Sequence, residues 1–140
     1  MSVVIAYDGS DEADAAVDAA VEEARLRGLP LHLVTAVAAT TGEDPAQARA
    51  VLDGRTAAEE RAVTAAARAD GSGITVETHV VPAAGDVAQA ILAVAREVGA
   101  TLIVTGARRR SAVGKLLLGS VSRDLIIGAD CSVLTARSAA

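Results

Sequence analysis

A glycine-rich, strongly basic segment holds the residues with the clearest potential for chemistry. It begins at Gly106, carries three arginines at 108–110, and closes with Gly119 and Ser120. The mainly apolar run 101–105 precedes it and is typical of a buried strand, and Gly119-Ser120 is typical of a helix start. Backbone N–H groups at the start of a helix attract anions, and guanidinium groups add charge. The segment therefore predicts an anion-binding loop between a strand and a helix.

The charge balance of the whole chain narrows the choice of anion. The chain has 13 basic and 18 acidic residues, a net charge of -5. This excess of acid argues against a protein that grips duplex nucleic acid through broad phosphate contacts. Three adjacent arginines are a local exception and favour a small anionic ligand. A solvated loop that improves solubility is the other interpretation of these arginines.

Length and composition predict one soluble domain. Of the 140 residues, 51% are hydrophobic but only 1% are aromatic, so the core must be built from Val, Leu, Ile and Ala. No apolar stretch reaches the roughly 20 residues that cross a bilayer. The single Cys131 has no partner for an internal disulfide, and the N-terminus leads into a strand without a signal peptide. We therefore expect a cytoplasmic protein.

Strands and helices are expected to alternate along the chain. Apolar runs predict strands at 3–7, 31–37, 74–81, 101–105 and 132–136, the third an edge strand because its side chains alternate in polarity. The four helices are expected from Ser10 to Gly28, after Ala46 with an interruption near Asp53-Gly54, from Gly85-Asp86 to Gly99, and over about 119–128. Residues 38–46 are expected to form an exposed, mobile lid.

This alternation predicts the fold class and the place of a site. Successive right-handed crossovers give a single α/β domain over residues 1–140, a Rossmann-like sandwich with helices on both faces of a sheet. Its five strands are expected to be mainly parallel, in the order 3-2-1-4-5. Ligands bind such sheets at the carboxyl ends of strands where the order reverses. If the first strand lies beside the fourth, Asp8 and Gly106 face each other there; the alternative roles of Asp8 are to cap the first helix or to end the strand.

The remaining candidates for chemistry are weaker. His32 and His79 are isolated on predicted strands without a second ligand at a metal-binding spacing, so we expect structural histidines and no metal site. Cys131 is expected to be a buried small residue, because no paired base is identifiable. Gly114-Lys115 is a fragment of the phosphate loop of nucleotide hydrolases, but the other positions of that loop do not match.

Four segments in the same order resemble the universal stress protein family over essentially the whole chain. They are Val3–Ser10, Gly85-Asp86, the stretch 102–106 together with 119–122, and 129–134. The nucleotide-binding branch of that family carries Gly, two residues, Gly, nine residues and Gly-Ser or Gly-Thr. Gly106 and Gly119-Ser120 match this motif, whereas Arg109 stands where the second glycine belongs.

The departure at Arg109 has two interpretations. Its side chain either blocks the phosphate pocket or replaces backbone amides with a charged, bidentate donor. Gly114, five residues further on, offers another point of loop flexibility.

The resemblance implies a site for ATP, with or without Mg²⁺, or for another adenine nucleotide. Asp8 would bind the adenosine beside backbone groups of Ala6 and Tyr7, and the backbone of Ala36 would contact adenine. Phosphates would meet the amides at the start of the last helix. The implied binding residues are Ala6, Tyr7, Asp8, Ala36, Gly106, Arg108, Arg109, Gly114, Gly119, Ser120 and Val121.

The implied role is that of a regulatory protein in stress response rather than an enzyme. No general base is evident, so we expect at most slow ATP hydrolysis. The family also implies a homodimer through the last strand, at Val133, Leu134 and Thr135. The alternative is a nucleotide-free dimer of the same fold that acts through protein partners, with Arg109 closing the pocket. Neither function needs nucleic acid or a membrane.

Overall fold

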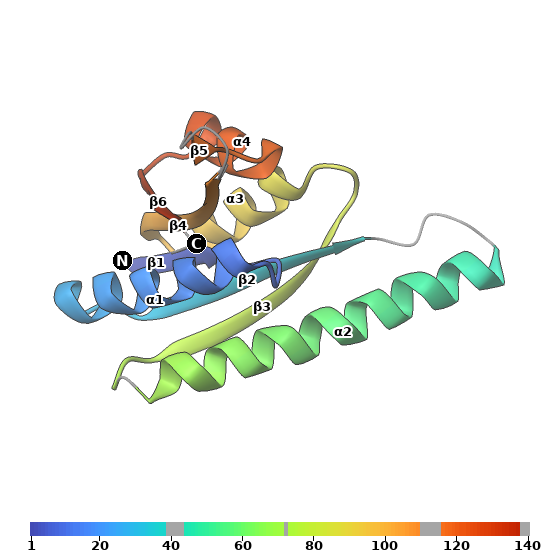
Figure 1. Ribbon diagram of the computed structural model, residues 1–140, viewed down its shortest axis with the longest axis horizontal. Coiled ribbons are helices and arrows are strands. Elements are labelled where there is room, and N and C mark those ends of the chain that lie inside the picture. Colours follow the sequence, from blue (N-terminus) through green and yellow to red (C-terminus); the bar gives the residue numbers. More distant parts are fainter. Residues whose placement is uncertain (39–43, 72, 110–115, 138–140) are drawn as a thin grey trace.

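The computed structural model describes residues 1–38, 44–71, 73–109 and 116–137. Strands and helices alternate, as the sequence predicts (Figure 1). In chain order the elements are β1 (Ser2–Ala6), α1 (Asp11–Arg27), β2 (Leu31–Ala38), α2 (Pro45–Asp70), β3 (Val76–Ala83), α3 (Val87–Glu97), β4 (Ala100–Arg109), β5 (Leu116–Leu117), α4 (Ser120–Gly128) and β6 (Ser132–Arg137).

The main sheet runs in the order β3-β2-β1-β4-β6, and each neighbouring pair is parallel. This confirms the predicted order, with β6 as the fifth strand, and β3 lies at an edge as expected. The two-residue strand β5 was not predicted. It pairs antiparallel with the end of β4 outside the main sheet.

Helices cover both faces of the sheet, because successive residues of a strand point to opposite sides. Val3 and Ile5 of β1 pack in one core with alanines of α1 and α2. Val4, between them, packs in a second core with α3 and with Leu125 of α4. Figure 1 shows the resulting layers, with α3 and α4 on one side of the sheet and α1 and α2 on the other. The small side chains of α1 and α2 let these helices lie close to the strands.

The predicted helix ends are confirmed at α1 and α3. The Ser10 side chain caps α1 by accepting a hydrogen bond from the backbone N–H of Ala13 at 3.2 Å. Gly28 ends that helix with φ 65°, the left-handed conformation that glycine adopts most easily. Asp86 caps α3 through the backbone N–H of Gln89 at 3.1 Å.

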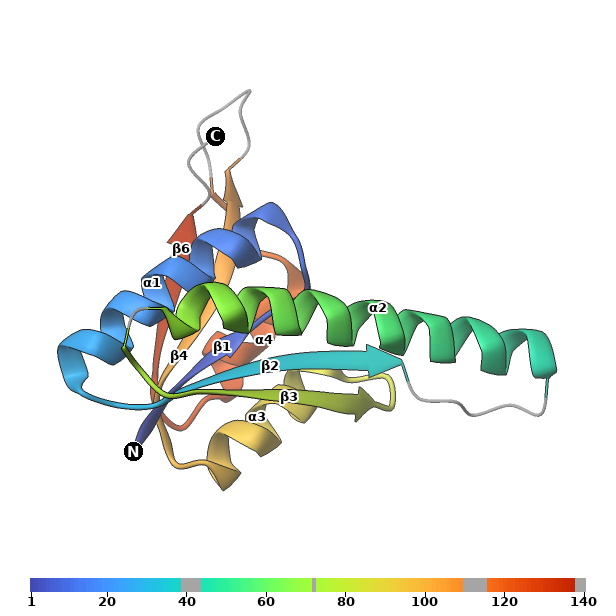
Figure 2. The ribbon, with the colours of Figure 1, turned by 90° about the horizontal axis from the view of Figure 1, so that it is seen from below.

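The predicted interruption near Asp53-Gly54 is wrong, because α2 continues through both residues. A single glycine in a helix costs only about 1 kcal/mol, and packing of α2 against the sheet offsets this cost through its buried alanines, such as Ala62 and Ala65. Figure 2 shows the N-terminal part of α2 projecting beyond the ends of β2 and β3. Residues 39–43 of the predicted lid lie outside the described residues, whereas Pro45 already begins the helix.

Strand β4 is longer than predicted. It continues past Thr105 because Gly106 pairs with Ala136 of β6 and Arg108 pairs with Leu117 of β5. The basic segment therefore begins within a strand rather than in a loop. This extension carries Arg108 along the sheet to the place where β4 meets α1 and α4.

Candidate functional site

A cavity of about 370 Å³ opens at the carboxyl ends of β1 and β4, where the strand order reverses. Its volume lies within the usual range of small-molecule sites, roughly 300–1,000 Å³. The β1–α1 turn, β2, α3, β4 and the start of α4 all contribute to its wall. Nine of the residues predicted from the sequence line it: Ala6, Tyr7, Asp8, Ala36, Gly106, Arg108, Gly119, Ser120 and Val121.

Two further predicted residues, Arg109 and Gly114, are not placed relative to the cavity. Arg109 is described by its backbone, which ends β4 and pairs with Leu116 of β5. Gly114 lies outside the described residues. The roles of Arg109 and Gly114 stay predictions.

The N-terminus of α4 opens into the cavity, and no side chain of the described residues caps it. Gly119 is the N-cap residue. The first helical hydrogen bond runs from the N–H of Arg123 to the Gly119 carbonyl at 3.0 Å. The amides of Ser120, Val121 and Ser122 therefore have no partner within the helix. Because the first turn also lacks acidic residues, this helix end is suited to an anion.

The N-terminus of α1 borders the same cavity but is already satisfied. Ser10 caps it, and Asp8 Oδ1 accepts hydrogen bonds from the Ser10 N–H, at 2.9 Å, and from the Ser10 hydroxyl. Asp8 therefore holds the turn before α1 and does not itself cap the helix. The first turn adds the carboxylates of Asp11, Glu12 and Asp14. An anionic ligand is disfavoured at this helix end.

Arg108 and Glu12 form an ion pair at the wall of the cavity. Arg108 Nη2 lies 3.1 Å from Glu12 Oε1, and both residues line the cavity. The arginine side chain is 64% exposed and the glutamate 19%. The guanidinium end of the pair is therefore in solvent, whereas the carboxylate is largely covered. The guanidinium can turn toward another anion, but Glu12 then loses its partner.

The two motif glycines have different structural roles. A Cβ built on Gly106 would stand 2.5 Å from the carbonyl oxygen of Glu12 and 2.6 Å from its carbonyl carbon. Glycine is needed there because the backbone of α1 passes close by. Among the described residues, none has an atom within 4 Å of a Cβ built on Gly119.

The sequence analysis missed several residues that line the cavity, notably Thr105 and Ser122. Their hydroxyl oxygens lie 2.8 Å apart, and Ser122 Oγ donates to the Gly106 carbonyl at 3.0 Å. These bonds fix the start of α4 against β4. The one available signal was the place of Ser122 in the first turn after Gly119. Also missed were Ser10, Glu12, Ala13, Val87 and Ile91.

Apolar side chains form the other end of the cavity. Val87 and Ile91 of α3 line it together with Ala6 and Ala36 at the ends of β1 and β2. The cavity thus combines an apolar wall with a helix N-terminus and an arginine. A ligand with a flat apolar part and an anionic part fits this arrangement.

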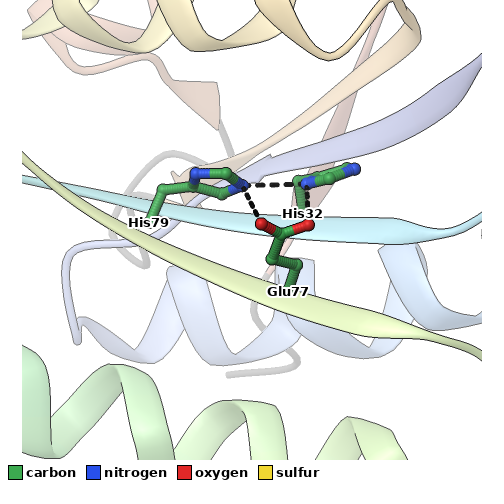
Figure 3. Close-up of side chains that lie close together, drawn as sticks. All are labelled: His32, Glu77 and His79. Atoms are coloured by element: carbon green, nitrogen blue, oxygen red, sulfur yellow. Dashed lines mark hydrogen bonds and ion pairs between the residues drawn. The ribbon is translucent and has the colours of Figure 1, made fainter.

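The prediction that His32 and His79 are isolated is wrong. His32 Nδ1 lies 2.8 Å from His79 Nε2, and the Glu77 carboxylate reaches both rings (Figure 3). Burial lowers the pKa of His32, and the neighbouring His79 lowers it further, while Glu77 acts in the opposite direction. The two histidines are 47 positions apart in the sequence, so only the pairing of β2 with β3 brings them together.

Comparison with known proteins identifies the family. The model of the universal stress protein family matches residues 1–137. A curated universal stress protein of Thermus aquaticus is 34% identical, covering 97% of this chain and 98% of its own.

Two solved structures from Archaeoglobus fulgidus have the same fold. One universal stress protein has a TM-score of 0.80 at 33% identity, covering 97% of this chain and 98% of its own. Another, in complex with dAMP, has a TM-score of 0.75 at 28% identity and covers 97% of each chain. In the described part of the present chain, no helix is both long enough and apolar enough to cross a membrane. The family match over nearly the whole chain shows that this protein belongs to the universal stress protein family.

Proposed function

We propose that the cavity binds an adenine nucleotide, with ATP as the best ligand, and that this binding regulates a cytoplasmic stress-response protein. The observation that carries the proposal is the N-terminus of α4, which has no side-chain cap among the described residues and opens into the cavity that Arg108 also lines. A phosphate chain satisfies such a helix end better than a neutral ligand does. The dAMP complex of the Archaeoglobus fulgidus relative supports an adenine nucleotide as the ligand class.

The parts of the nucleotide divide along the cavity. Adenine occupies the apolar end between Ala36 and the α3 residues Val87 and Ile91. The ribose lies near Asp8, whose carboxylate is held in place by Ser10. The phosphates accept hydrogen bonds from the first amides of α4 and from the Ser120 hydroxyl. Arg108 leaves Glu12 and pairs with a terminal phosphate, where a bidentate contact is favourable.

The nucleotide is a regulatory ligand in this proposal rather than a rapidly consumed substrate. Hydrolysis needs a general base that orients a water molecule. Of the two carboxylates among the described residues that line the cavity, Asp8 is held by Ser10, so Glu12 alone would be left without a partner when Arg108 turns to the phosphate. Mg²⁺ would be held mainly by the phosphates themselves. We expect ATP turnover to be slow.

Calorimetric titration with a series of ligands tests the proposal. Affinity should rise from adenosine through AMP and ADP to ATP, measured with and without Mg²⁺, because each added phosphate reaches further along the helix end and toward Arg108. GTP, which carries the same phosphates on a different nucleobase, is the control for recognition of adenine. Equal affinities for adenosine and ATP would refute the proposed phosphate site, and absence of binding to the whole series would refute nucleotide binding.

We further propose that β6 pairs two copies of the chain. Within the described residues its strand neighbour is β4 alone, so one edge of β6 is open. Val133, Leu134 and Thr135 are half-buried on this strand, and an open apolar edge favours association. Sedimentation velocity at micromolar concentration should give a dimer. A monomer throughout the concentration range would contradict this.

A further inference from the structure

Three side chains with metal-binding atoms converge on two neighbouring strands, away from the nucleotide cavity. His32 of β2 lies directly opposite Glu77 of β3 in the parallel register, and His79 stands two residues further along β3. Residues two apart on a strand share a face, so all three project on the side where Val34 and Val81 pack with α3. Figure 3 shows the three side chains pointing toward one another.

The distances between the ligand atoms match a tetrahedral metal centre after small shifts. His32 Nδ1 lies 2.8 Å from His79 Nε2, 3.7 Å from one Glu77 oxygen, and the other Glu77 oxygen lies 3.9 Å from His79 Nε2. Zn²⁺ bonds of about 2.0–2.2 Å at tetrahedral angles place the ligand atoms about 3.3 Å apart. The two ring nitrogens therefore need to move apart by about half an ångström. The 3.7 Å and 3.9 Å contacts use different Glu77 oxygens, so the carboxylate must also turn to bring one oxygen to both rings; the three ligand atoms already lie within 4.8 Å of one another. The Glu77 side chain, 64% exposed, has room for this movement.

The donor set determines which metals fit. Two imidazoles and one carboxylate suit Zn²⁺ and similar transition metals, whereas Mg²⁺ and Ca²⁺ prefer sites made of oxygen atoms. Without metal, one ring donates its N–H to the other across the 2.8 Å contact. A bound ion takes a lone pair from both nitrogens, so that ring moves its proton to its other nitrogen. This is a change of tautomer with no net loss of a proton.

A hydrogen-bonded histidine pair without metal is the simpler interpretation, but it leaves Glu77 unexplained. The contact between the two rings does not require a carboxylate. The exposed Glu77 nevertheless lies within 3.9 Å of both ring nitrogens, one oxygen toward each. Three donors around one point are the geometry that a metal ion requires.

We propose that His32, Glu77 and His79 bind one divalent transition-metal ion, Zn²⁺ in the first place. A water molecule fills the fourth position of the tetrahedral site. The ion ties the edge strand β3 to β2. His32 and Ala36 are four residues apart on β2, about 13 Å along a strand, so the ion does not contact the nucleotide cavity.

Titration of the full chain with Zn²⁺ tests the proposal. The protein is purified without a polyhistidine tag, treated with a chelator and titrated by calorimetry with a zinc salt alone. We expect one saturable site per chain and a higher Tm with Zn²⁺, because the ion binds the folded state. Co²⁺ in place of Zn²⁺ should give the strong visible absorption of a tetrahedral site. Binding without saturation, or with Mg²⁺ as tightly as with Zn²⁺, would overturn the proposal.

Three variants locate the ion. His79→Gln should weaken Zn²⁺ binding by on the order of 100-fold, and Glu77→Gln by about tenfold. Loss of a residue that only hydrogen-bonds to a metal ligand already lowers metal affinity by about 10–100-fold, and loss of a ligand itself should cost a comparable amount or more. Glu22→Gln removes an exposed carboxylate from α1, on the other face of the sheet, and should bind as the parent does. Glu77 is exposed, so its variant should fold even if His79→Gln does not. Unchanged Zn²⁺ binding in Glu77→Gln would place the ion elsewhere.

Discussion

Two helices begin at the same cavity, and their N-termini are opposite in character. The start of α1 has a side-chain cap from Ser10 and three acidic residues in its first turn. The start of α4 has neither among the described residues. Both helices carry the same backbone dipole.

The side chains around each helix start therefore decide which one can hold an anion. The contacts of α1 satisfy its own backbone and exclude further negative charge. The described contacts of α4 leave the amides of its first turn without a partner beside the cavity. A phosphate group would therefore lie at α4, with α1 forming the opposite wall.

The largest expected effect comes from giving α4 an acidic first turn, as in α1. Ser120→Asp places a carboxylate where the phosphates would lie, and the charge repulsion should lower ATP affinity by on the order of 100-fold. Adenosine affinity should change little. Ser132→Asp is the matched control, because it adds the same charge at an exposed position at the start of β6. Equal losses in both variants would contradict a local effect at α4.

The two motif glycines should differ in their effect on stability. Gly106→Ala forces a methyl group against the backbone of Glu12 and should lower the free energy of unfolding by about 1–3 kcal/mol. Gly119→Ala meets no neighbour within 4 Å among the described residues and should change it by less than about 0.5 kcal/mol. Urea denaturation of both variants measures the difference. A destabilisation at Gly119 as large as that at Gly106 would show that the contact with α1 is not the cause.

Removing a carboxylate from α1 should make the cavity more favourable to anions. Glu12→Gln frees Arg108 from its ion pair and should raise ATP affinity by about threefold to tenfold. The gain should shrink at high salt, because the Arg108 guanidinium is exposed and its attraction to the phosphates is screened. Calorimetry at two salt concentrations provides the measurement. A loss of affinity would mean that Glu12 positions Arg108 for the ligand.

The smallest expected effect is a pH dependence at α1. Tyr7 donates to Asp14 in the first turn of α1 at 2.8 Å, and burial, followed by this bond and the Asp14 charge, raises the Tyr7 pKa from 10.0 to about 12. Above pH 10 the unfolded chain loses the proton first, so the unfolded state is favoured as pH rises toward 12. Half a pH unit above 10, the free energy of unfolding should have fallen by less than about 1 kcal/mol.

Two measurements check this pH dependence. Tyr7 is the one tyrosine of the chain, so its ultraviolet absorbance titration reports this pKa directly. The stability of Tyr7→Phe should depend less on pH in this range. A midpoint near the ordinary value for tyrosine would contradict a buried, hydrogen-bonded hydroxyl.

Local signals in the sequence were sufficient for most of the fold and for much of the cavity. Ser10, Gly28 and Asp86 mark helix ends through contacts within a few residues, and the spacing of Gly106 and Gly119 marks the two sides of the cavity. The continuity of α2 through Gly54 could not be predicted, because it depends on packing against the sheet. The length of β4 depends on its pairing with β5 and β6.

The histidine cluster was missed for the same reason. Nothing near His32 in the sequence indicates His79, since their contact follows from the register of β2 and β3. The ion pair of Arg108 with Glu12 likewise joins residues that are 96 positions apart. Side-chain clusters across elements require the three-dimensional fold, whereas backbone sites at helix starts are visible in local motifs.

Backbone amide chemical shifts during an ATP titration test the central claim most directly. The amides of Ser120, Val121 and Ser122 should show the largest shifts with ATP and much smaller ones with adenosine, while the Ala13 amide, already bound by Ser10, should move little. ATP shifts concentrated at the start of α1, or equal shifts at α4 with ATP and adenosine, would contradict the assignment of α4 as the phosphate-binding helix.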